Sequence, residues 1–276
     1  MSIASYWSEN ELEVLRSSYG KVSYLRFQYL LPGRTTPAIH AMARALGLKA
    51  NLSLSASIRR SGFRAYSLNY EYFAKLTVEN CYWGGFIAAD GCIARKPTPR
   101  ISIGLSKKDR EHLVRFAKCI EFSGPISDRQ AKLLGKIFPY SQICISVQQS
   151  TLDDLYNWFN VIERKSLVLQ PPNLKLIEHV ASFIVGYVDG NGSIGYSKHD
   201  RSFRLGIRGS FALLTWIKCC FDEWCPSKKM VGIGTSDGYP KYQLSGHRLM
   251  RIAAILTTHS PIMLSRKWSA IVQALR

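Results

Sequence analysis

The sequence lacks the features of membrane proteins, secreted proteins and zinc proteins. Its longest strongly apolar run covers only residues 180–188, far short of the roughly 20 residues that a membrane-spanning helix needs. The N-terminus has no basic start followed by an apolar segment, so we expect no secretory signal. The seven cysteines form no CxxC pair and the six histidines form no HxxxH pair. We therefore expect reduced thiols, no disulfide framework and no zinc site.

Acidic residues are also scarce. Only 19 Asp and Glu stand against 37 Lys and Arg in 276 residues, which gives a formal net charge of +18. The basic excess is spread along the chain instead of being concentrated in a tail, and it favours a polyanionic partner, nucleic acid ahead of a membrane surface. A hydrophobic fraction of 46% is sufficient for a folded core, and the length suits one large domain with a small appendage.

The first 50 residues are predicted to form a small three-helix unit. Ser8 and Glu11 have the spacing of a capping box, in which each side chain satisfies a free amide of the first helical turn. A second helix is expected over residues 23–31. The third is expected to begin at Thr36, as a cap followed by proline, and to end at Gly47.

This pattern resembles the Myb/SANT-type helix-turn-helix modules. The resemblance rests on residues 7–15, 31–39 and 45–48. In such modules the third helix enters the major groove of DNA, which implies a DNA-binding domain over residues 1–50. The candidate contacts are Arg34, Thr35, Thr36, His40 and Arg44. The alternative is a helical brace packed on the main domain.

Residues 51–76 are predicted to be a basic linker. Short polar side chains dominate its first part, and Arg59, Arg60 and Arg64 follow. These arginines are candidates for contact with phosphates, and the alternative is an ordinary solvated linker.

The remaining 200 or so residues contain an internal duplication. Two apolar, glycine-bearing segments, 81–93 and 183–194, each end in a polar turn, and their matching residues keep a constant offset of 101 positions. Gly85 matches Gly186 and Gly91 matches Gly192. Each copy is followed by a pattern of two strands, a helix, two strands and a helix. We define half 1 as residues 77–172 and half 2 as residues 173–276.

The duplicated pattern resembles the LAGLIDADG homing endonucleases in their single-chain, two-motif form, over about residues 80–270. The resemblance implies an α+β fold in which two αββαββα halves are related by a pseudo-twofold axis and form a DNA-binding saddle of strands. It also implies a monomeric endonuclease that depends on Mg²⁺, or on another divalent cation such as Mn²⁺ or Ca²⁺. The implied substrate is a long, asymmetric double-stranded DNA site.

The resemblance assigns the metal-binding positions to the ends of the two motifs. In half 1 they are the carboxylate of Asp90 and the carbonyl of Ala89, and in half 2 they are Asn191 and the carbonyl of Gly190. Asn191 departs from the family pattern because its amide oxygen is neutral where an anion is expected. Asp189 is no substitute, because two residues along a helix correspond to a rotation of about 200°. We therefore expect slow nicking of one strand, or no cleavage.

Basic and strand residues complete the predicted site. Lys165 and Lys267 occupy related places in the repeat, and the resemblance makes them catalytic candidates. The alternation of the strands sends every second side chain to one face, where Arg reads guanine and Gln reads adenine in the major groove. The DNA-binding candidates on the strands and hairpin ends are Arg95, Lys96, Arg100, Gln142, Lys198, Arg201, Arg204, Arg208, Lys241 and Gln243.

Two alternatives to a DNA endonuclease stay open at this stage. One is a cleavage-inactive DNA-binding protein, which Asn191 and the N-terminal module would both suit. The other is an RNA maturase that acts on intron RNA with the same scaffold. In each case we expect a protein that is not secreted and that resides in the cytoplasm with the nucleoid, or in an organelle or nucleus.

Overall fold

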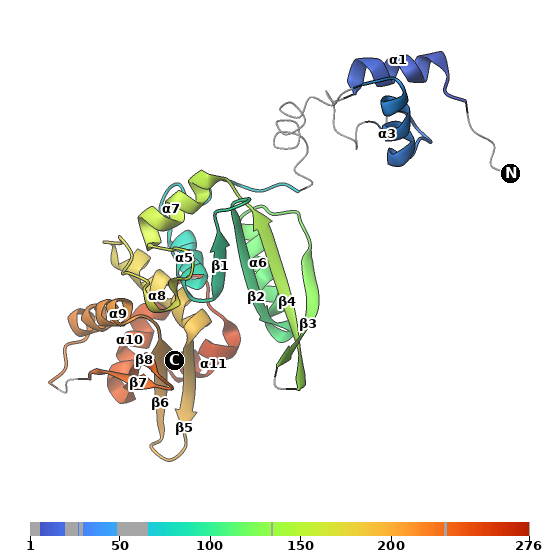
Figure 1. Cartoon of the computed structure of the whole chain (residues 1–276). Coiled ribbons are helices and arrows are strands. Elements are labelled where there is room, and N and C mark those ends of the chain that lie inside the picture. The colour runs from blue at the N-terminus through green and yellow to red at the C-terminus, as the bar shows by residue number, and fades with distance from the viewer. Residues whose placement is uncertain are drawn as a thin grey trace. The chain divides into compact units, whose positions relative to one another are not determined.

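The computed structural model describes residues 6–19, 27, 30–48, 66–133, 135–228 and 231–275. The chain divides into two compact units, Met1–Tyr66 and Ser67–Arg276 (Figure 1). No helix in the described ranges is long and apolar enough to cross a membrane.

The N-terminal unit contains α1 (Glu9–Ser18) and α3 (Thr36–Ala45). The predicted capping box is present, with Ser8 and Glu11 bonded to each other's backbone amides. The cap of α3 is Thr35 and not Thr36, because the Thr35 hydroxyl accepts from the amide of Ala38. The predicted second helix over 23–31 falls largely outside the described residues, so the helix-turn-helix stays a prediction.

Half 1 follows the predicted order of elements. A long helix is followed by two strands, a helix, two more strands and a helix. These elements are α5 (Val78–Asp90), β1 (Gly91–Ala94), β2 (Arg100–Ser106), a short 3-10 helix η1 (Lys107–Asp109), α6 (Arg110–Cys119), β3 (Ile126–Leu133), β4 (Lys136–Ser146), α7 (Gln149–Phe159) and η2 (Lys165–Leu167).

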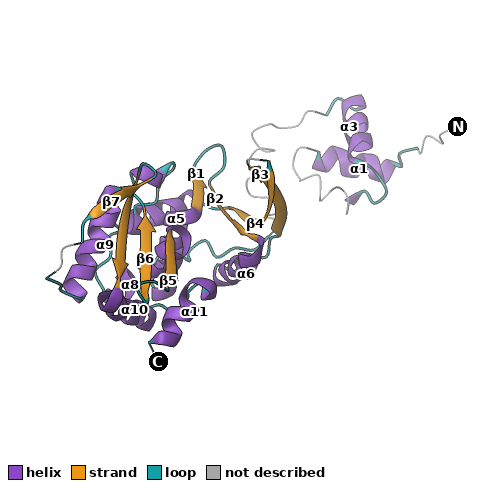
Figure 2. Ribbon diagram, turned by 90° about the horizontal axis from the view of Figure 1, so that it is seen from below, coloured by secondary structure: helices purple, strands orange, loops and turns teal. Residues whose placement is uncertain are grey.

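Half 2 repeats this order and adds a C-terminal helix. Its elements are α8 (Ile177–Asn191), β5 (Gly192–Ser197), β6 (Ser202–Arg208), α9 (Phe211–Trp224), β7 (Ile233–Ser236), β8 (Tyr239–Ser245), α10 (Gly246–His259) and α11 (Ser265–Ala274). Each half forms a four-stranded antiparallel sheet, with the orders β1-β2-β4-β3 and β5-β6-β8-β7. Figure 2 shows the two sheets as separate groups of strands. The predicted α+β class and duplicated architecture are confirmed.

The predicted linker over 51–76 ends earlier than expected. The second compact unit begins at Ser67, whose backbone amide donates to Ser123. Phe73 is buried in the main core with only 2% of its surface exposed. Residues 67–76 therefore belong to the second compact unit, because the Phe73 side chain is part of its hydrophobic core.

The two motif helices α5 and α8 pack directly against each other at matched glycines. A Cβ placed on Gly85 would lie 2.0 Å from the carbonyl oxygen of Phe183, and one on Gly186 would lie 2.0 Å from that of Tyr82. The same contact thus occurs twice, once in each direction. Gly84 has a different reason to be small, since its Cβ would meet the ring of Phe159 at 2.6 Å. This close approach brings the C-terminal ends of the helices together.

Candidate active site and nucleic-acid surface

The predicted metal-binding residues lie at the ends of the paired helices. Asp90 is the last residue of α5 and Asn191 is the last residue of α8. The two ends nearly touch, because a Cβ on Gly190 would lie 2.3 Å from the Cβ of Ala89 and 3.3 Å from the Cγ of Asp90. The structure therefore brings Ala89, Asp90 and Gly190 together, with Asn191 next in sequence.

The environment of Asp90 sets its charge. Loss of water around the packed helix ends raises the pKa of its carboxyl group, and the positive charges of Lys267, Lys165 and Arg266 oppose that shift. Desolvation disfavours the charged form while nearby cations favour it. Desolvation and the neighbouring positive charges therefore shift the pKa of Asp90 in opposite directions.

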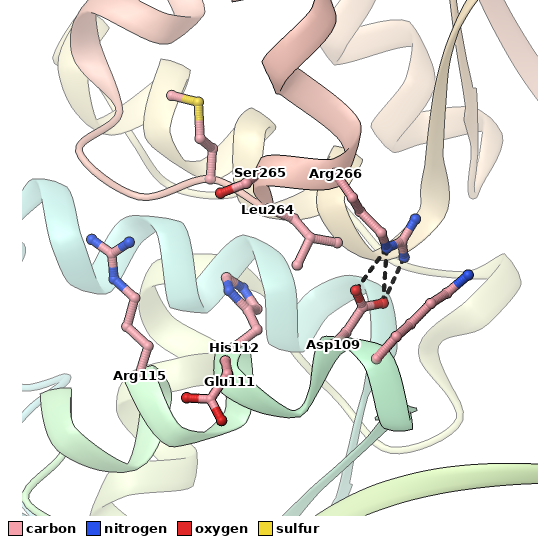
Figure 3. A pocket seen from close by; sticks show the side chains of 9 residues that line it. Asp109, Glu111, His112, Arg115, Leu264, Ser265 and Arg266 are labelled. Carbon is pink, nitrogen blue, oxygen red and sulfur yellow. Dashed lines mark hydrogen bonds and ion pairs between the residues drawn. The ribbon is translucent and has the colours of Figure 1, made fainter.

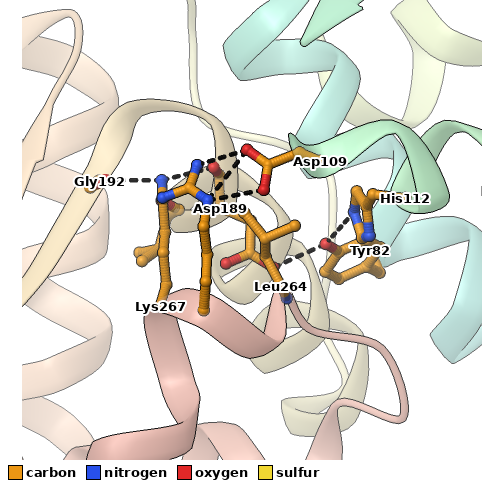
Figure 4. A network of polar contacts seen from close by, with 9 residues as sticks. Tyr82, Asp109, His112, Asp189, Gly192, Leu264 and Lys267 are labelled. Carbon is orange, nitrogen blue, oxygen red and sulfur yellow. Dashed lines mark hydrogen bonds and ion pairs between the residues drawn. The ribbon is translucent and has the colours of Figure 1, made fainter. Parts of the chain in front are cut away.

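Lys165 and Lys267 occupy equivalent positions in the two halves. Lys165 is buried, and its Nζ donates to the carbonyl of Gly91 just after α5. Lys267 Nζ donates to the matching carbonyl of Gly192 at 2.7 Å, and also to those of Asp189 at 2.5 Å and Val188 at 3.0 Å (Figure 4). Burial lowers the pKa of both lysines. Each cation complements the negative end of its motif helix.

Asn191 opens onto the sheet of half 2. Its Nδ2 donates to the Tyr187 hydroxyl at 3.4 Å, and that hydroxyl donates to the carbonyl of Arg208 at 3.1 Å. One cavity beside it joins the helix end to the strands. Its lining residues are Gly190, Asn191, Gly192, Ser193, Gly206, Arg208 and Lys241. The neutral amide of Asn191 thus lines a cavity that also contains two positively charged side chains, Arg208 and Lys241.

Asp189 points away from this cavity, as the helical rotation predicts. It is 2% exposed, and its carboxylate accepts from the Tyr82 hydroxyl, the Leu264 amide and the Trp268 Nε1, each at 2.7 Å. Burial raises the pKa of Asp189 to about 6 against the opposing effect of these hydrogen bonds. This carboxylate fastens α11 to the motif helices.

Two charged residues at this junction are absent from the sequence-based predictions. Asp109, at the start of α6, is almost fully buried and forms a two-pronged ion pair with Arg266 at 2.7 Å. The pair lines a cavity between α6 and the start of α11, together with His112 and Arg115 (Figure 3). Arg266 directly precedes the candidate Lys267, so its position next to the site can be read from the sequence. Its acidic partner Asp109 lies 157 residues away along the chain, and no local pattern connects the two.

The outer face of the half 2 sheet is rich in cations, as predicted. Leu205 and Ile207 are buried while Arg204 and Arg208 are exposed, which confirms the alternation. In register, Arg208 lies opposite Lys241. A hollow on this face is lined by Arg204, Gly206, Lys241 and Gln243, among others. Two aspartates pair with the arginines: Arg204 with Asp200, and Arg208 with Asp237 at 2.6 Å.

The corresponding face of half 1 carries a neutral row next to the helix end. Cys92, Ser102 and Cys144 lie side by side across β1, β2 and β4. Arg100 and Gln142 lie further along the same face, opposite Ser146 and Gly104. The outward-facing strand residues of the two halves therefore differ in chemistry, and their contact with DNA stays a prediction.

The hairpin-end candidates lie outside these rows. Arg95 pairs with Asp153 at 2.8 Å. Lys96, Lys198 and Arg201 are exposed at the ends of the hairpins. Their contact with DNA stays a prediction.

Comparison with solved structures identifies the architecture. The homing endonuclease I-WcaI, solved bound to its DNA recognition sequence, matches with a TM-score of 0.51 at 13% identity, over 83% of this chain and 96% of that one. The chain has the LAGLIDADG fold. Other matches are the I-LtrWI LAGLIDADG homing endonuclease bound to target DNA (TM-score 0.46, 10% identity, 75% of this chain and 90% of that one) and the N-terminal LAGLIDADG domain of DUF199/WhiA (0.43, 16%, 74% and 93%). No family model and no curated protein matches the sequence.

Outside the LAGLIDADG core, the structure gives Arg34 a role within the N-terminal unit. Its guanidinium grips both carboxylate oxygens of Glu11, at 2.7 and 2.8 Å, and lies 4.5 Å from the ring centre of Trp7. The Arg34 hydrogen bonds lower the pKa of Glu11 to about 2. Arg34 thus links α1 to the segment before α3.

The other N-terminal candidates are placed in different ways. Thr35 caps α3, and His40 contacts the hydroxyl of Tyr19 at 3.2 Å. Thr36 and Arg44 are exposed. The predicted contacts of Arg59, Arg60 and Arg64 lie outside the described residues.

The donor atoms at the LAGLIDADG helix ends suit a hard divalent cation. They comprise one carboxylate, at Asp90, one amide oxygen, at Asn191, and backbone carbonyls, and oxygen ligands are those that Mg²⁺ and Ca²⁺ prefer. Within the described residues, no cluster of three or more His, Cys, Asp or Glu side chains could hold a metal ion. These oxygen donors are of the kind that Mg²⁺ takes, and the side-chain donor of half 2 is neutral where that of half 1 is a carboxylate.

Proposed function

We propose that this protein is a site-specific DNA endonuclease that hydrolyses phosphodiester bonds in a long, asymmetric duplex. The observation that carries the proposal is the meeting of two motif helix ends, with Asp90 and Asn191, beside strand faces that bear Arg and Gln. I-WcaI, a homing endonuclease with a comparable fold, is bound to its DNA recognition sequence in its solved structure, which supports duplex DNA as the partner. Because one chain supplies both halves, we propose that it acts as a monomer.

In this proposal the carboxylate of Asp90 and the carbonyl of Ala89 would hold a divalent cation at the half 1 position, and the amide oxygen of Asn191 and the carbonyl of Gly190 would hold one at the half 2 position. When bound, such a cation neutralises charge on the scissile phosphate and on the leaving oxygen. The close approach of the two helix ends at Ala89 and Gly190 supports this assignment. Lys165 and Lys267 keep the two helix ends in place and supply positive charge next to the phosphates.

The two strands of the target are expected to be cut at different rates. The half 2 position lacks an anion, so it holds a cation less well than the half 1 position. We propose that the protein nicks one strand faster than the other and makes double-strand breaks poorly. Mn²⁺ is expected to support the reaction as well, because it also prefers oxygen ligands.

A supercoiled-plasmid library, incubated with the protein and Mg²⁺, tests this function. We expect nicked circles to accumulate before linear DNA, N191D to raise the yield of linear DNA, and D90N to abolish nicking. Equal cleavage of both strands by the natural protein and by N191D would contradict the proposed asymmetry. Lys118→Gln, which changes an exposed residue in the last turn of α6 that is no part of the proposed site, is the control.

A second candidate function is sequence-specific DNA binding without cleavage. Asn191 favours it, because one full charge is missing from the predicted metal site. Tight binding of a selected duplex with no nicking by the natural protein, and cleavage by N191D, would establish this function. Competition between the selected duplex and structured intron RNA separates these two DNA functions from the maturase alternative, which predicts preferential binding of the RNA.

A further inference from the structure

The end of half 2 is fastened to half 1 by an ion pair. Asp109 belongs to half 1, where η1 meets α6, and Arg266 belongs to α11 of half 2. The guanidinium Nε contacts both carboxylate oxygens, at 2.7 and 2.9 Å, and its Nη2 contacts one of them at 2.7 Å. Asp109 is 7% exposed, so this charge has little access to water and depends on its partner.

A second set of contacts joins the same elements. Asp189 accepts from Leu264 and Trp268, at the start of α11, and from Tyr82 of half 1. The Tyr82 hydroxyl is also 2.7 Å from His112 Nε2. Because that hydroxyl donates its proton to Asp189, His112 must donate to it through Nε2–H (Figure 4). The start of α11 is therefore bonded to Asp189 of α8 and to Asp109 beside α6, and Tyr82 of α5 bonds to the same Asp189 carboxylate.

The matching contact to half 1 is a neutral hydrogen bond and not an ion pair: Ser210, at the start of α9, donates to the carbonyl of Leu169, two residues after η2. Ala88 stands where half 2 has Asp189, and Leu213 of α9 stands where half 1 has His112. Lys165 belongs to the short η2 helix, whereas Lys267 belongs to the ten-residue α11. The lysine of half 2 is thus carried on a helix whose position depends on residues of the other half.

We propose that Asp109 is a positioning residue for the half 2 site. Through Arg266 it fixes the start of α11, and so it holds the Lys267 ammonium on the carbonyls at the end of α8. The proposal deepens the proposed function, on which its kinetic consequence rests. Loss of the ion pair releases Lys267 and slows cleavage of the strand that half 2 serves, while Lys165 and the half 1 strand are unaffected.

Competitive lysine acylation, read by mass spectrometry on the full-length protein, tests the positioning without cleavage. We expect slow labelling of Lys165 and Lys267 in the natural protein, and several-fold faster labelling of Lys267 alone in D109N. D128N is the matched control, because Asp128 pairs with Lys107 and Arg110 beside the same helix but touches no residue of α11. D109E, which keeps the carboxylate, should restore most of the protection.

The proposal is overturned if Lys267 in D109N labels no faster than in D128N, or if Lys165 is released equally. Should D109N fail to fold, R266K serves instead, since it keeps the charge but loses the two-pronged contact. Its Lys267 should label at an intermediate rate, and labelling as slow as in the natural protein would likewise count against the proposal.

Strand-resolved cleavage provides the second measurement. In an N191D background, adding D109N should lower kcat several-fold for one strand, leave kcat for the other unchanged and leave KM unchanged for both. An equal loss on both strands would indicate a general structural effect and overturn the proposal. If N191D cleaves neither strand, the proposed nuclease function fails, and the labelling experiment still decides the role of Asp109.

Discussion

Half 1 and half 2 share one backbone plan but use their charges differently. Half 1 places its motif carboxylate, Asp90, at the helix end, where it faces the proposed DNA. Half 2 places its carboxylate, Asp189, two residues earlier, where it is buried and bonded to α11. A shift of two positions therefore turns a candidate metal ligand into a structural anchor, because a helix rotates about 100° per residue.

The helix interface is the part in which the two halves should behave alike. We expect G85A and G186A each to lower the free energy of unfolding by about 4 kcal/mol or more, because the new Cβ would overlap a backbone carbonyl. Urea unfolding of both variants measures the effect. G195A is the control, since nothing lies within 4 Å of its Cβ position. Markedly unequal losses of unfolding free energy in G85A and G186A would show that the two sides of the helix interface are not equivalent.

The anchor in half 2 should matter more to stability than the carboxylate in half 1. We expect D189A to cost about 3 kcal/mol, because three buried donors lose their acceptor, whereas D90N should cost less than about 0.5 kcal/mol. Denaturant melts of the two variants make the comparison. A D90N variant as unstable as D189A would show that the two carboxylates are not specialised.

His112 should make the stability of the protein depend on pH, whereas Leu213, the matching residue of half 2, cannot titrate. Burial, together with the positive charge of Arg115, lowers the pKa of His112 from 6.5 to about 4, while Asp109 opposes the shift. The unfolded chain therefore binds the proton first as the pH falls. Relative to H112L, the natural protein should lose up to about 3 kcal/mol of stability between pH 6.5 and pH 4. Parallel stability curves for the two proteins would refute this.

The two sheet faces should contribute unequally to DNA binding. We expect R204Q, R208Q and K241Q each to weaken binding by about 1 kcal/mol and to reduce the salt dependence by about one ion. C92S and C144S in half 1 should change neither. Titration of the selected duplex at several salt concentrations measures this. The contrast fails if the cysteine variants alter the salt slope as the cation variants do.

Much of the core could be predicted from the sequence because it is periodic. The constant offset between Gly85 and Gly186 indicates a duplication, and alternation around Leu205 and Ile207 indicates which strand residues face outward. These signals are local or repeated, so one chain suffices to find them. The location of Asn191 at a helix end, away from the direction of Asp189, also follows from helical geometry alone.

Some boundaries and partners could not be predicted this way. Phe73 lies in a stretch of mixed aromatic, apolar and polar residues, 67–76, and only the packed core reveals that it belongs to the second unit. Arg34 has the sequence context of a DNA contact, yet its guanidinium is bonded to Glu11, which lies 23 positions earlier. Both cases depend on contacts between residues that no local pattern connects.

The sequence alone determined the duplicated order of elements, the positive charge and the unequal pair Asp90 and Asn191. Only the tertiary structure decided what surrounds them. It showed that Asp189 and Asp109 of different halves both hold α11, and that the two lysines bond to matching carbonyls after α5 and α8. The physical reason is distance along the chain: hydrogen bonds and ion pairs between residues 74 to 157 positions apart follow from packing and leave no periodic trace.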